Sequence, residues 1–463
     1  MSAIANMIAA VGRKTSFSGG VHPPQSKHLT RDRQIQPGPA VKELSVFLSQ
    51  HIGAAAQPAV NKGDIIQAGQ KIGQCSGFVC APVHSPVAGK VKEIALRSHA
   101  VLGRSPAVIV EAESASAPSR PAFTVPPDFD PAKYTPQQIC DAVREAGIVG
   151  MGGAGFPTSV KIQPDPKTPK HTLIVNGCEC EPYITCDYRV MLEWTQQVIT
   201  GARLAQRACG AANLAIAIED NKPEAVEKVT AALEKMGLAN AIRVVVVKTK
   251  YPQGGERQLI WAVLNKIVPT GGIPPAIGVV VTNVATAAAI ADAVIHGRPL
   301  THRVVTVTGE GIASPGNYYV SVGTPVEALI GHCGGMTQEG TRVVLGGPMM
   351  GIAIADLGTP ITKTSGAVTV LTREQVGAAG YERPQTTCIR CGRCLRACPE
   401  NLNPTRIAHA VKNNLMDVAE SHYISACIEC GCCSYVCPAK IDLTGYIRTG
   451  KILRARKLKK MPG

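Results

Sequence analysis

Two cysteine motifs near the end of the chain constrain its fold more than any other feature. Residues 388–404 read CIRCGRCLRACPENLNP and residues 427–443 read CIECGCCSYVCPAKIDL, and both contain the pattern C-x2-C-x2-C-x3-C-P. Three thiolates at two-residue gaps can surround one corner of an iron–sulfur cubane, and the proline after the fourth cysteine turns the chain away. The motifs therefore predict two [4Fe–4S] clusters. A structural zinc site is the alternative, but zinc sites do not normally use this duplicated pattern.

The fourth cysteine of each motif is expected to bind the cluster of the other motif, as in ferredoxins with two clusters. One cluster then has the ligands Cys388, Cys391, Cys394 and Cys437, and the second has Cys427, Cys430, Cys433 and Cys398. This crossing would hold the two clusters close enough for rapid electron exchange. Cys432 lies outside the repeated pattern and is not expected to be a cluster ligand. The spacer between the motifs has helical apolar spacing, so this region resembles the all-helical ferredoxin type.

The placement of cysteines and the first residues of the chain predict its compartment. Nine of the 17 cysteines fall between residues 388 and 437, which indicates metal-bound thiolates in a reducing cytoplasm rather than disulfides. The apolar start MSAIANMIAAV precedes Arg13 and Lys14, the wrong order for a secretory signal. The charge-free stretch 267–291 reads as a strand followed by a helix, so we expect buried core there rather than a membrane span.

The charge balance predicts the kind of partner. The chain has 463 residues, long enough for several domains, and a formal net charge of +15. A basic excess favours nucleic acid, anionic lipid or acidic proteins. Because no basic stretch interleaved with aromatic residues and no nucleic-acid motif occurs, we expect no nucleic acid, and favour a membrane surface and acidic redox partners.

A glycine-rich loop at residues 147–161, GIVGMGGAGFPTSVK, contains the pattern G-x-G-x-x-G. A Rossmann fingerprint must follow a strand. Here the preceding segment TPQQICDAVREAG predicts a helix, with Thr135 and Gln138 forming a capping box. The interpretation as a dinucleotide-binding turn therefore lacks the preceding strand that it requires. The loop is left with two interpretations: a flexible turn, or a backbone cradle for a phosphate or a flat ring system.

Short strands and helices alternate after this loop. HTLIVNG predicts a buried strand, followed by a loop with Glu179 and Glu181, and NLAIAIED, IRVVVVKTK and GVVVTN predict three further strands, each followed by a helix. Such alternation predicts an open α/β sheet. Ligands of these sheets bind at the carboxyl ends of the strands, where these loops converge.

These motifs together resemble the flavin- and NADH-binding subunit of respiratory complex I. The resemblance rests on GMGGAGFPT with Lys161, on N-x-x-E-x-E-P from Asn176, on YPQGGERQL and on VVVTNVAT. It implies that FMN is bound by Gly152, Gly153, Gly155, Phe156, Lys161, Asn176 and Asn283. It also implies that Glu179, Glu181 and Glu256 lie on the nicotinamide side, as the catalytic residues. Gly255 and Cys180 depart from the complex I pattern.

The order of modules resembles the RnfC family of the Rnf (Rsx) electron-transport complex, over about residues 19–447. HIGAAAQPAVNKGDIIQAGQKIG and APVHSPVAGKVKEI resemble a biotinyl/lipoyl-like barrel sandwich, interpreted as structural, and residues 303–332 resemble a β-grasp (SLBB) module. The expected fold is thus multidomain α/β. Its expected parts are the barrel sandwich (19–112), a linker (113–134), the FMN/NADH α/β domain (135–300), the β-grasp region (301–380), the helical two-cluster domain (381–447) and a basic tail (448–463).

This second resemblance implies a reaction and a place in the cell. Electrons would pass from NADH through FMN and two [4Fe–4S] clusters towards membrane-bound and ferredoxin-like Rnf subunits and ferredoxin, reversibly and coupled to ion transport. The protein would dock peripherally at the cytoplasmic face of the bacterial inner membrane. Two rivals use related modules: a cobalamin reductase of bacterial microcompartments, whose flavin domain comes first, and a non-enzymatic relay or scaffold with a decayed flavin site.

Overall fold

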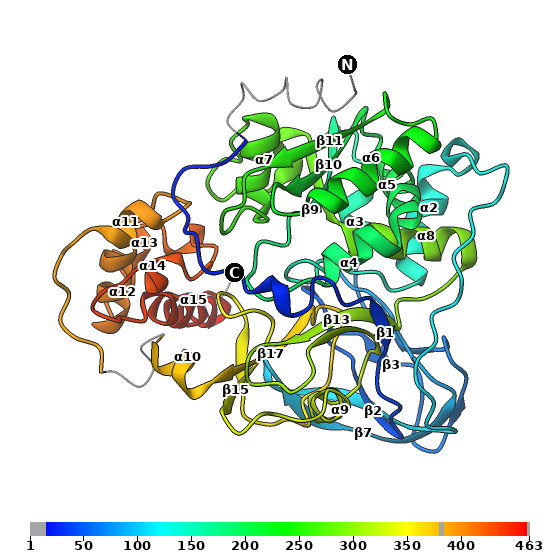
Figure 1. Cartoon of the computed structure of the whole chain (residues 1–463), viewed down its shortest axis with the longest axis horizontal. Coiled ribbons are helices and arrows are strands. Elements are labelled where there is room, and N and C mark those ends of the chain that lie inside the picture. The colour runs from blue at the N-terminus through cyan, green and yellow to red at the C-terminus, as the bar shows by residue number, and fades with distance from the viewer. Residues whose placement is uncertain (1–14, 379–383, 461–463) are drawn as a thin grey trace.

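The computed structural model describes residues 15–378 and 384–460, and these form four parts arranged around an N-terminal segment (Figure 1). A barrel sandwich is followed by a central α/β domain, a β-grasp sheet and a helical C-terminal region. Among the described residues, no helix is both long and apolar enough to cross a bilayer. The stretch 267–291 instead contributes a strand and a helix to the core of the central domain, as expected.

The central domain is built on a four-stranded parallel sheet of order β11-β10-β9-β12. Its strands are β9 (Thr172–Gly177), β10 (Asn213–Glu219), β11 (Ile242–Val247) and β12 (Val279–Asn283). Its helices are α2 (Pro136–Glu145), α3 (Thr158–Ile162), α4 (Cys186–Glu193), α5 (Thr195–Cys209), α6 (Pro223–Lys235), α7 (Glu256–Leu264) and α8 (Val284–His296). The predicted alternation of strands and helices is confirmed.

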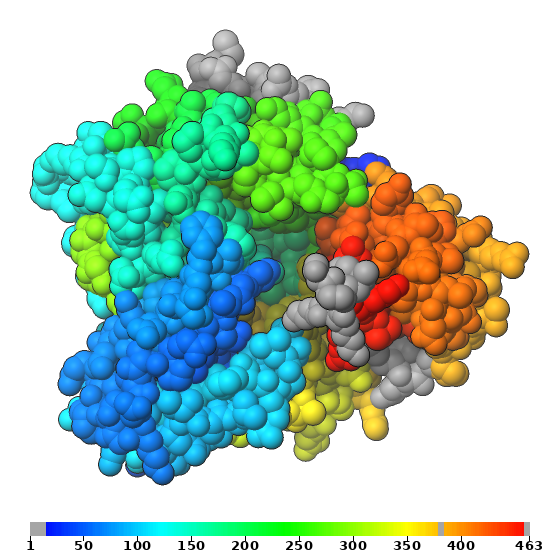
Figure 2. Space-filling model, turned by 180° about the vertical axis from the view of Figure 1, so that it is seen from behind, coloured from blue at the N-terminus to red at the C-terminus, as the bar shows by residue number. Residues whose placement is uncertain are grey.

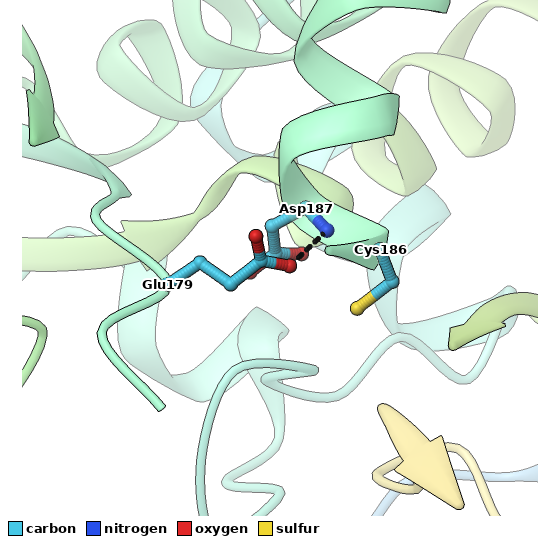
Figure 3. Close-up of side chains that lie close together, drawn as sticks. All are labelled: Glu179, Cys186 and Asp187. Atoms are coloured by element: carbon cyan, nitrogen blue, oxygen red, sulfur yellow. Dashed lines mark hydrogen bonds between the residues drawn. The ribbon is translucent and has the colours of Figure 1, made fainter. Parts of the chain in front are cut away.

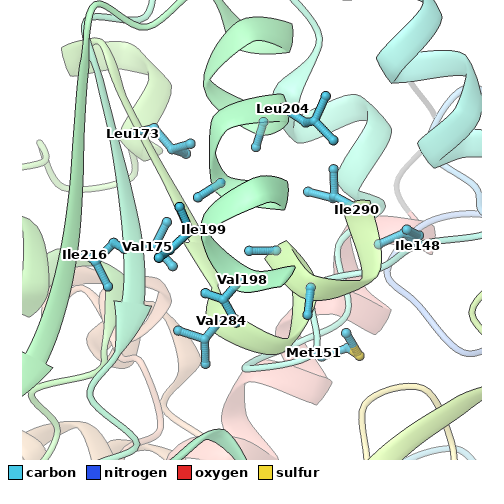
Figure 4. Close-up of a cluster of buried hydrophobic side chains, with 14 of the residues drawn as sticks. Ile148, Met151, Leu173, Val175, Val198, Ile199, Leu204, Ile216, Val284 and Ile290 are labelled. Carbon is cyan, nitrogen blue, oxygen red and sulfur yellow. The ribbon is translucent and has the colours of Figure 1, made fainter. Parts of the chain in front are cut away.

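Alternate residues of the central strand face opposite layers of helices, because side chains in a strand point alternately to the two faces. Leu173 and Val175 of β9 belong to the core beneath α5 and α8 (Figure 4), whereas Ile174 packs with α7. The helices α5 and α8 approach closely at Gly201, where a Cβ atom would lie 1.7 Å from the Ala287 carbonyl oxygen. Truncating a fully buried leucine such as Leu173 to alanine costs roughly 2–5 kcal/mol in such a core.

The helix predicted before the glycine loop is α2. The Thr135 side chain accepts from the Gln138 backbone N–H, and the Gln138 side chain accepts from the Thr135 N–H, so the predicted capping box is present. Gly147 follows the helix with φ +64°, a conformation that favours glycine. The glycine loop therefore follows a helix and not a strand.

The barrel sandwich consists of two small antiparallel sheets. One contains β2 (Glu43–Phe47), β8 (Gly103–Ala112), β7 (Gly89–His99) and β4 (Ile65–Ile66), and the other contains β3 (Gln57–Pro58), β5 (Lys71–Gln74) and β6 (Val83–His84). Leu44, Ile66 and Ile72 are among the fully buried side chains between them. Val322, which follows β14 of another part, also belongs to this core.

The β-grasp sheet has six strands in the order β1-β14-β13-β17-β15-β16. Five come from its own region: β13 (His302–Thr308), β14 (Gly316–Ser321), β15 (Gly340–Leu345), β16 (Ile352–Ile354) and β17 (Ala367–Thr372), with the helices α9 (Val326–His332) and α10 (Arg373–Ala378). The sixth, β1 (Ile35–Pro37), comes from the N-terminal segment and pairs in parallel with β14.

Residues 15–37, here called the N-terminal strap, run between the parts (Figure 1, dark blue). The Gly20 N–H donates to the Ala397 carbonyl of the C-terminal region at 2.9 Å, and Val21 pairs with Tyr251 of the central domain. The Asn317 amide of β14 donates to the Thr30 carbonyl at 2.9 Å. The first part of the range expected for the barrel module thus lies outside its two sheets and links three other parts.

The C-terminal region is helical, as its spacing predicts. It contains α11 (Arg393–Ala397), α12 (Pro404–Lys412), α13 (Met416–Ser421), α14 (Cys432–Tyr435) and α15 (Leu443–Lys460). Helix α15 runs across residue 448, where the basic tail was predicted to begin. Basic side chains of α15 pair with carboxylates of the same region, Lys451 with Glu429 and Arg454 with Glu420 at 3.5 Å, which holds the helix against its neighbours.

Candidate functional site

Two asparagines mark the carboxyl end of the central sheet, where the sequence predicts the flavin. Asn176 of β9 and Asn283 of β12 are register partners on adjacent parallel strands. The Asn283 Oδ1 atom accepts from the N–H groups of Ala285 and Thr286 and caps α8, while its Nδ2 donates to Asp187 Oδ2 at 2.6 Å. The Asn176 Nδ2 donates to the Gly254 carbonyl at 2.9 Å. Both amides are therefore fixed in orientation.

The glycine loop lies against one of these asparagines, Asn283, and the first turn of α8. The Met151 N–H donates to Thr286 Oγ1 at 3.0 Å, which ties the loop to the first turn of α8. A Cβ atom on Gly152 would lie 2.6 Å from Asn283 Nδ2, so only glycine allows this approach. At Gly153 the same atom would meet nothing within 4 Å, and residues 152–154 are exposed. This open stretch of backbone suits a phosphate or a flat ring, and thus FMN.

Lys161 of α3 is a cation held at this end of the sheet. Its Nζ donates to Glu256 Oε1 at 2.5 Å and to the Val281 carbonyl of β12 at 3.0 Å. The structure therefore brings together Lys161 and Glu256, which the sequence assigns to the flavin and the nicotinamide respectively. Phe156 is half-buried, and its carbonyl accepts from the Gly150 N–H at 3.0 Å within the loop.

The two other glutamates of the predicted nicotinamide side are held by backbone donors. Glu179 has a side chain only 3% exposed, and its Oε1 accepts from the Asp187 N–H at 2.6 Å (Figure 3). Glu181 Oε1 accepts from the N–H groups of Met349 and Met350 at 2.7 and 3.0 Å. Burial raises the pKa of Glu179 to about 7, and it also raises the pKa of Glu181.

Cys186 lies beside the first of these glutamates. Polar atoms of Glu179, Cys186 and Asp187 lie within 4.8 Å of one another (Figure 3). Glu179 accepts from the N–H groups of Asp187 and Tyr188, Asp187 accepts from the Asn283 amide, and Lys27 Nζ lies 4.0 Å from Glu179 Oε2. We therefore assign no cation to this group.

Four of the eight predicted cluster ligands line one cavity, here called the inner site. They are Cys398, Cys427, Cys430 and Cys433, the set that the crossed arrangement predicts for one cluster. Donors surround them: the N–H groups of Leu402 and Glu429 lie 3.3 Å from the sulfurs of Cys398 and Cys427. Burial raises the pKa of Cys427 to about 11 and that of Cys433 to about 12, so a cluster binding there displaces protons.

The other four predicted ligands, Cys388, Cys391, Cys394 and Cys437, are more accessible, and we call their position the outer site. Cys391 is exposed and the other three are half-buried. Cys394 Sγ lies 3.0 Å from Thr405 Oγ1 and packs in one small cluster with Cys433 of the inner site. The inner site brings four thiols and hydrogen-bonding donors together, a set that fits a [4Fe–4S] cluster. The ligand set of the outer site stays a prediction from the sequence.

The inner site adjoins the central domain. Cys180, between the two buried glutamates, shares a hydrophobic cluster with Tyr251, Cys430 and Cys432. The Tyr251 hydroxyl donates to the Cys430 carbonyl at 2.8 Å. On the other flank Glu400 pairs with Arg257 at 3.1 Å and accepts from Gln258 at 2.7 Å. The loop at the predicted nicotinamide side is therefore packed against the cysteines of one cluster site.

Family comparisons agree with this arrangement. The sequence model of the Nuo51 FMN-binding domain matches residues 143–292, and that of the RnfC barrel sandwich hybrid domain matches residues 15–115. The SLBB domain matches residues 304–353 and the 4Fe-4S dicluster domain matches residues 384–441. FMN and two [4Fe–4S] clusters are thus the cofactors of this chain, and the expected fold class is confirmed.

Whole-chain relatives decide the family. The chain is 39% identical to the C subunit of the proton-translocating ferredoxin:NAD(+) oxidoreductase complex of Clostridium ljungdahlii, over 88% of this chain and 87% of that protein. The chain belongs to the RnfC family. It is 38% identical to the C subunit of the Na(+)-translocating complex of Acetobacterium woodii, over 88% of this chain and 90% of that protein. For the C subunit of the ion-translocating oxidoreductase complex of Rhodobacter capsulatus the identity is 40%, over 84% and 73%.

A solved structure shares part of this fold. A chain of an NAD+-reducing [NiFe]-hydrogenase in the H2-reduced state superposes with a TM-score of 0.50 at 21% identity, over 72% of this chain and 68% of that chain. As a member of the RnfC family, the present chain is an electron-transfer subunit of an oxidoreductase complex, and other Rnf subunits are its partners.

Several residues of the site have no counterpart in the sequence predictions. Lys27 of the strap and Lys222 are buried ammonium groups beside the loop of Glu179. Tyr251 joins the two cofactor regions. The motif YPQGGERQL includes Tyr251, and its position in the loop after β11 could have drawn attention to it. The sequence around Lys27 offers no comparable signal, because lysines are mostly exposed.

Proposed function

We propose that this RnfC protein oxidises NADH at the glycine-loop site and delivers electrons through the inner site and then the outer site to its partner subunits. When bound, FMN supplies the exchange between a two-electron donor and one-electron carriers. The observation that supports this order is the packing of Cys180 against Tyr251 and Cys430, because it joins the flavin side directly to the inner site.

The chain's own residues have separable tasks in this proposal. Gly152, Gly153 and Gly155 leave room for the flavin, Phe156, Lys161, Asn176 and Asn283 surround it, and Glu179, Glu181 and Glu256 face the nicotinamide. Cys398, Cys427, Cys430 and Cys433 hold the inner cluster, and Cys388, Cys391, Cys394 and Cys437 hold the outer one. No side chain has to remove a proton from carbon, so these residues chiefly bind, orient and exclude water.

The outer site is the proposed exit for electrons. Its loop carries three exposed arginines, Arg390, Arg393 and Arg396, and no carboxylate between Cys388 and Cys398. Ile389 and Leu395 beside them are 68% and 43% exposed. Positive charge around exposed apolar side chains suits an acidic partner that docks transiently. We propose that this face meets a partner Rnf subunit and that the chain is peripheral, at the cytoplasmic face of the membrane.

Anaerobic titration of the full chain with NADH, followed by absorbance and EPR, tests the proposal. Bleaching of the flavin followed by signals of reduced clusters is the expected result. If dithionite reduces the clusters but NADH changes neither flavin nor clusters, the chain is a relay within the complex rather than the NADH-oxidising subunit.

A further inference from the structure

The turn of residues 179–184, which carries Glu179 and Glu181, adopts an unfavourable backbone. Glu179 has φ +49° and Tyr183 has φ +70°, and neither residue is glycine. Such residues persist only where their surroundings hold them in place. The turn ends at α4, and both of its carboxylates are directed by N–H donors from elsewhere, Asp187 for Glu179 and Met349 for Glu181. Its shape therefore sets where two of the proposed nicotinamide-side carboxylates lie.

One ammonium group from the N-terminal strap occupies the inside of this turn. Lys27 Nζ donates to the carbonyl oxygens of Glu179, Glu181 and Ile184 at 2.8, 3.0 and 2.5 Å. These contacts use all three of its donors. Lys27 is buried, and its Nζ also lies 4.0 Å from Glu179 Oε2, a carboxyl group of the turn that it organises.

The strap itself is anchored on both sides of Lys27. The Tyr183 N–H donates to the Gln25 carbonyl at 2.8 Å, and the hydroxyls of Thr30 and Thr185 lie 2.7 Å apart in a buried contact. The lysine is thus presented to the turn from a fixed backbone. Removing its ammonium would leave three carbonyls without this donor in a buried place.

We propose that Lys27 is a positioning residue for NADH: it holds the turn of residues 179–184 in the shape that places Glu179 and Glu181 beside the nicotinamide. Lys27 touches neither the flavin loop nor a cluster cysteine in any of its hydrogen bonds. Its effect is therefore expected on the use of NADH and not on the binding of FMN or clusters. The inference rests on the proposed NADH oxidation.

The test compares the full chain, loaded with FMN and both clusters, with its Lys27→Met variant. Methionine keeps an unbranched side chain, one atom shorter than that of lysine, but donates no hydrogen bond. We expect the variant to keep its FMN and its dithionite-reducible clusters, while its KM for NADH with ferricyanide as acceptor rises at least about tenfold and its kcat changes less, since small misplacements of positioning groups have effects up to ~100-fold. A purely structural role would instead lower stability or FMN content and leave KM unchanged.

Arg31→Gln is the matched control. Arg31 lies on the same strap but pairs with Glu224 at 3.0 Å, with side chains 33% and 53% exposed, so its loss should leave KM within about twofold. If Lys27→Met does not accumulate, Lys27→Gln, which keeps an amide donor, is measured instead and is expected to raise KM less. An unchanged KM in whichever of these variants retains FMN overturns the inference alone. Failure of NADH to reduce the unsubstituted chain overturns the proposed function, and the inference with it.

Discussion

Cys394 and Cys433 occupy equivalent places in the two cysteine motifs, and each has a threonine hydroxyl beside its sulfur, Thr405 at 3.0 Å and Thr444 at 3.4 Å. The similarity extends to the backbone, since Gly392 and Gly431 have φ values of +70° and +79°. The same local sequence therefore builds the same local structure twice.

The two sites differ in what covers them. The inner site is covered by the central domain, through Tyr251 and the pair of Arg257 with Glu400, whereas Cys391 of the outer site is exposed. Seen from behind, the molecule is hollowed where the central domain, the barrel and the C-terminal region meet (Figure 2). The comparison teaches that one repeated motif can be placed in two different surroundings. In the proposed route, these tertiary contacts decide which site is the entrance for electrons and which is the exit.

Loss of a cluster ligand on each side should separate these roles most sharply. In Cys430→Ala the inner cluster is removed, so NADH should bleach the flavin but reduce neither cluster. In Cys391→Ala the inner cluster should still be reduced by NADH, while transfer to partner subunits is lost. EPR after NADH and after dithionite measures both. If NADH reduces the outer cluster of Cys430→Ala as fast as in the unsubstituted chain, the inner site is not on the route.

The features of the two sites that can be predicted from the sequence are those set by nearby residues. The spacing of the cysteines predicts both ligand sets, and the capping box of Thr135 and Gln138 shows that a helix precedes the glycine loop. Whether the crossed ligand sets hold the clusters stays a prediction, although four of the cysteines line one cavity.

The contacts between segments far apart in the chain could not be predicted from the sequence. The bond from Tyr251 to Cys430 and the parallel pairing of β1 with β14 join segments far apart in the chain, and no local pattern specifies such partners. Nor does the sequence around Lys27 distinguish a buried lysine from the exposed ones that are more usual. The difference between the inner and outer sites arises from these contacts, so it appears only in the folded chain.

Exposure predicts which cluster is lost first. A mild oxidant with a chelator reaches the exposed Cys391 more readily than the inner cysteines, which lie behind the central domain. During timed anaerobic addition of ferricyanide and EDTA we expect the iron content to fall in two steps, with the EPR signal of the outer cluster lost in the first. The order can be assigned with Cys391→Ala, which should lack the first step. Simultaneous loss of both signals would contradict the proposed difference in protection.

The docking of the inner site on the central domain should depend on Glu400. Its carboxylate is 11% exposed and has two partners, Arg257 and Gln258. Replacing it with alanine leaves a partly buried guanidinium without its carboxylate and should cost about 1–3 kcal/mol in the free energy of unfolding. Thermal unfolding of the holo chain measures the loss, and NADH-driven cluster reduction should slow.

Asp417→Ala is the control for that measurement. Asp417 pairs with Lys457 at 3.5 Å, and the two side chains are 94% and 60% exposed. Because water screens this ion pair, its loss should change the free energy of unfolding very little. Equal destabilisation by both substitutions would mean that the contact of Glu400 with the central domain does not contribute to docking.

The threonine hydroxyls offer the finest test, because here the two sites are most alike. A hydroxyl that donates to a ligand sulfur stabilises the reduced, more negative cluster, so its loss lowers the reduction potential. A neutral hydrogen bond contributes a net free energy of about 0.5–1.5 kcal/mol. For a one-electron reduction this free energy corresponds to a shift in reduction potential of at most roughly 20–65 mV. Thr405→Val should shift the reduction potential of the outer cluster only, and Thr444→Val that of the inner cluster only, as measured by EPR-monitored redox titration.

The size of the two shifts should differ. Since Cys433 also lies in the buried cavity, where charges are less screened, we expect the larger shift in reduction potential for Thr444→Val. Equal shifts would show that the hydroxyl–sulfur contact alone sets this contribution, and that the burial which separates the entrance from the exit does not tune it.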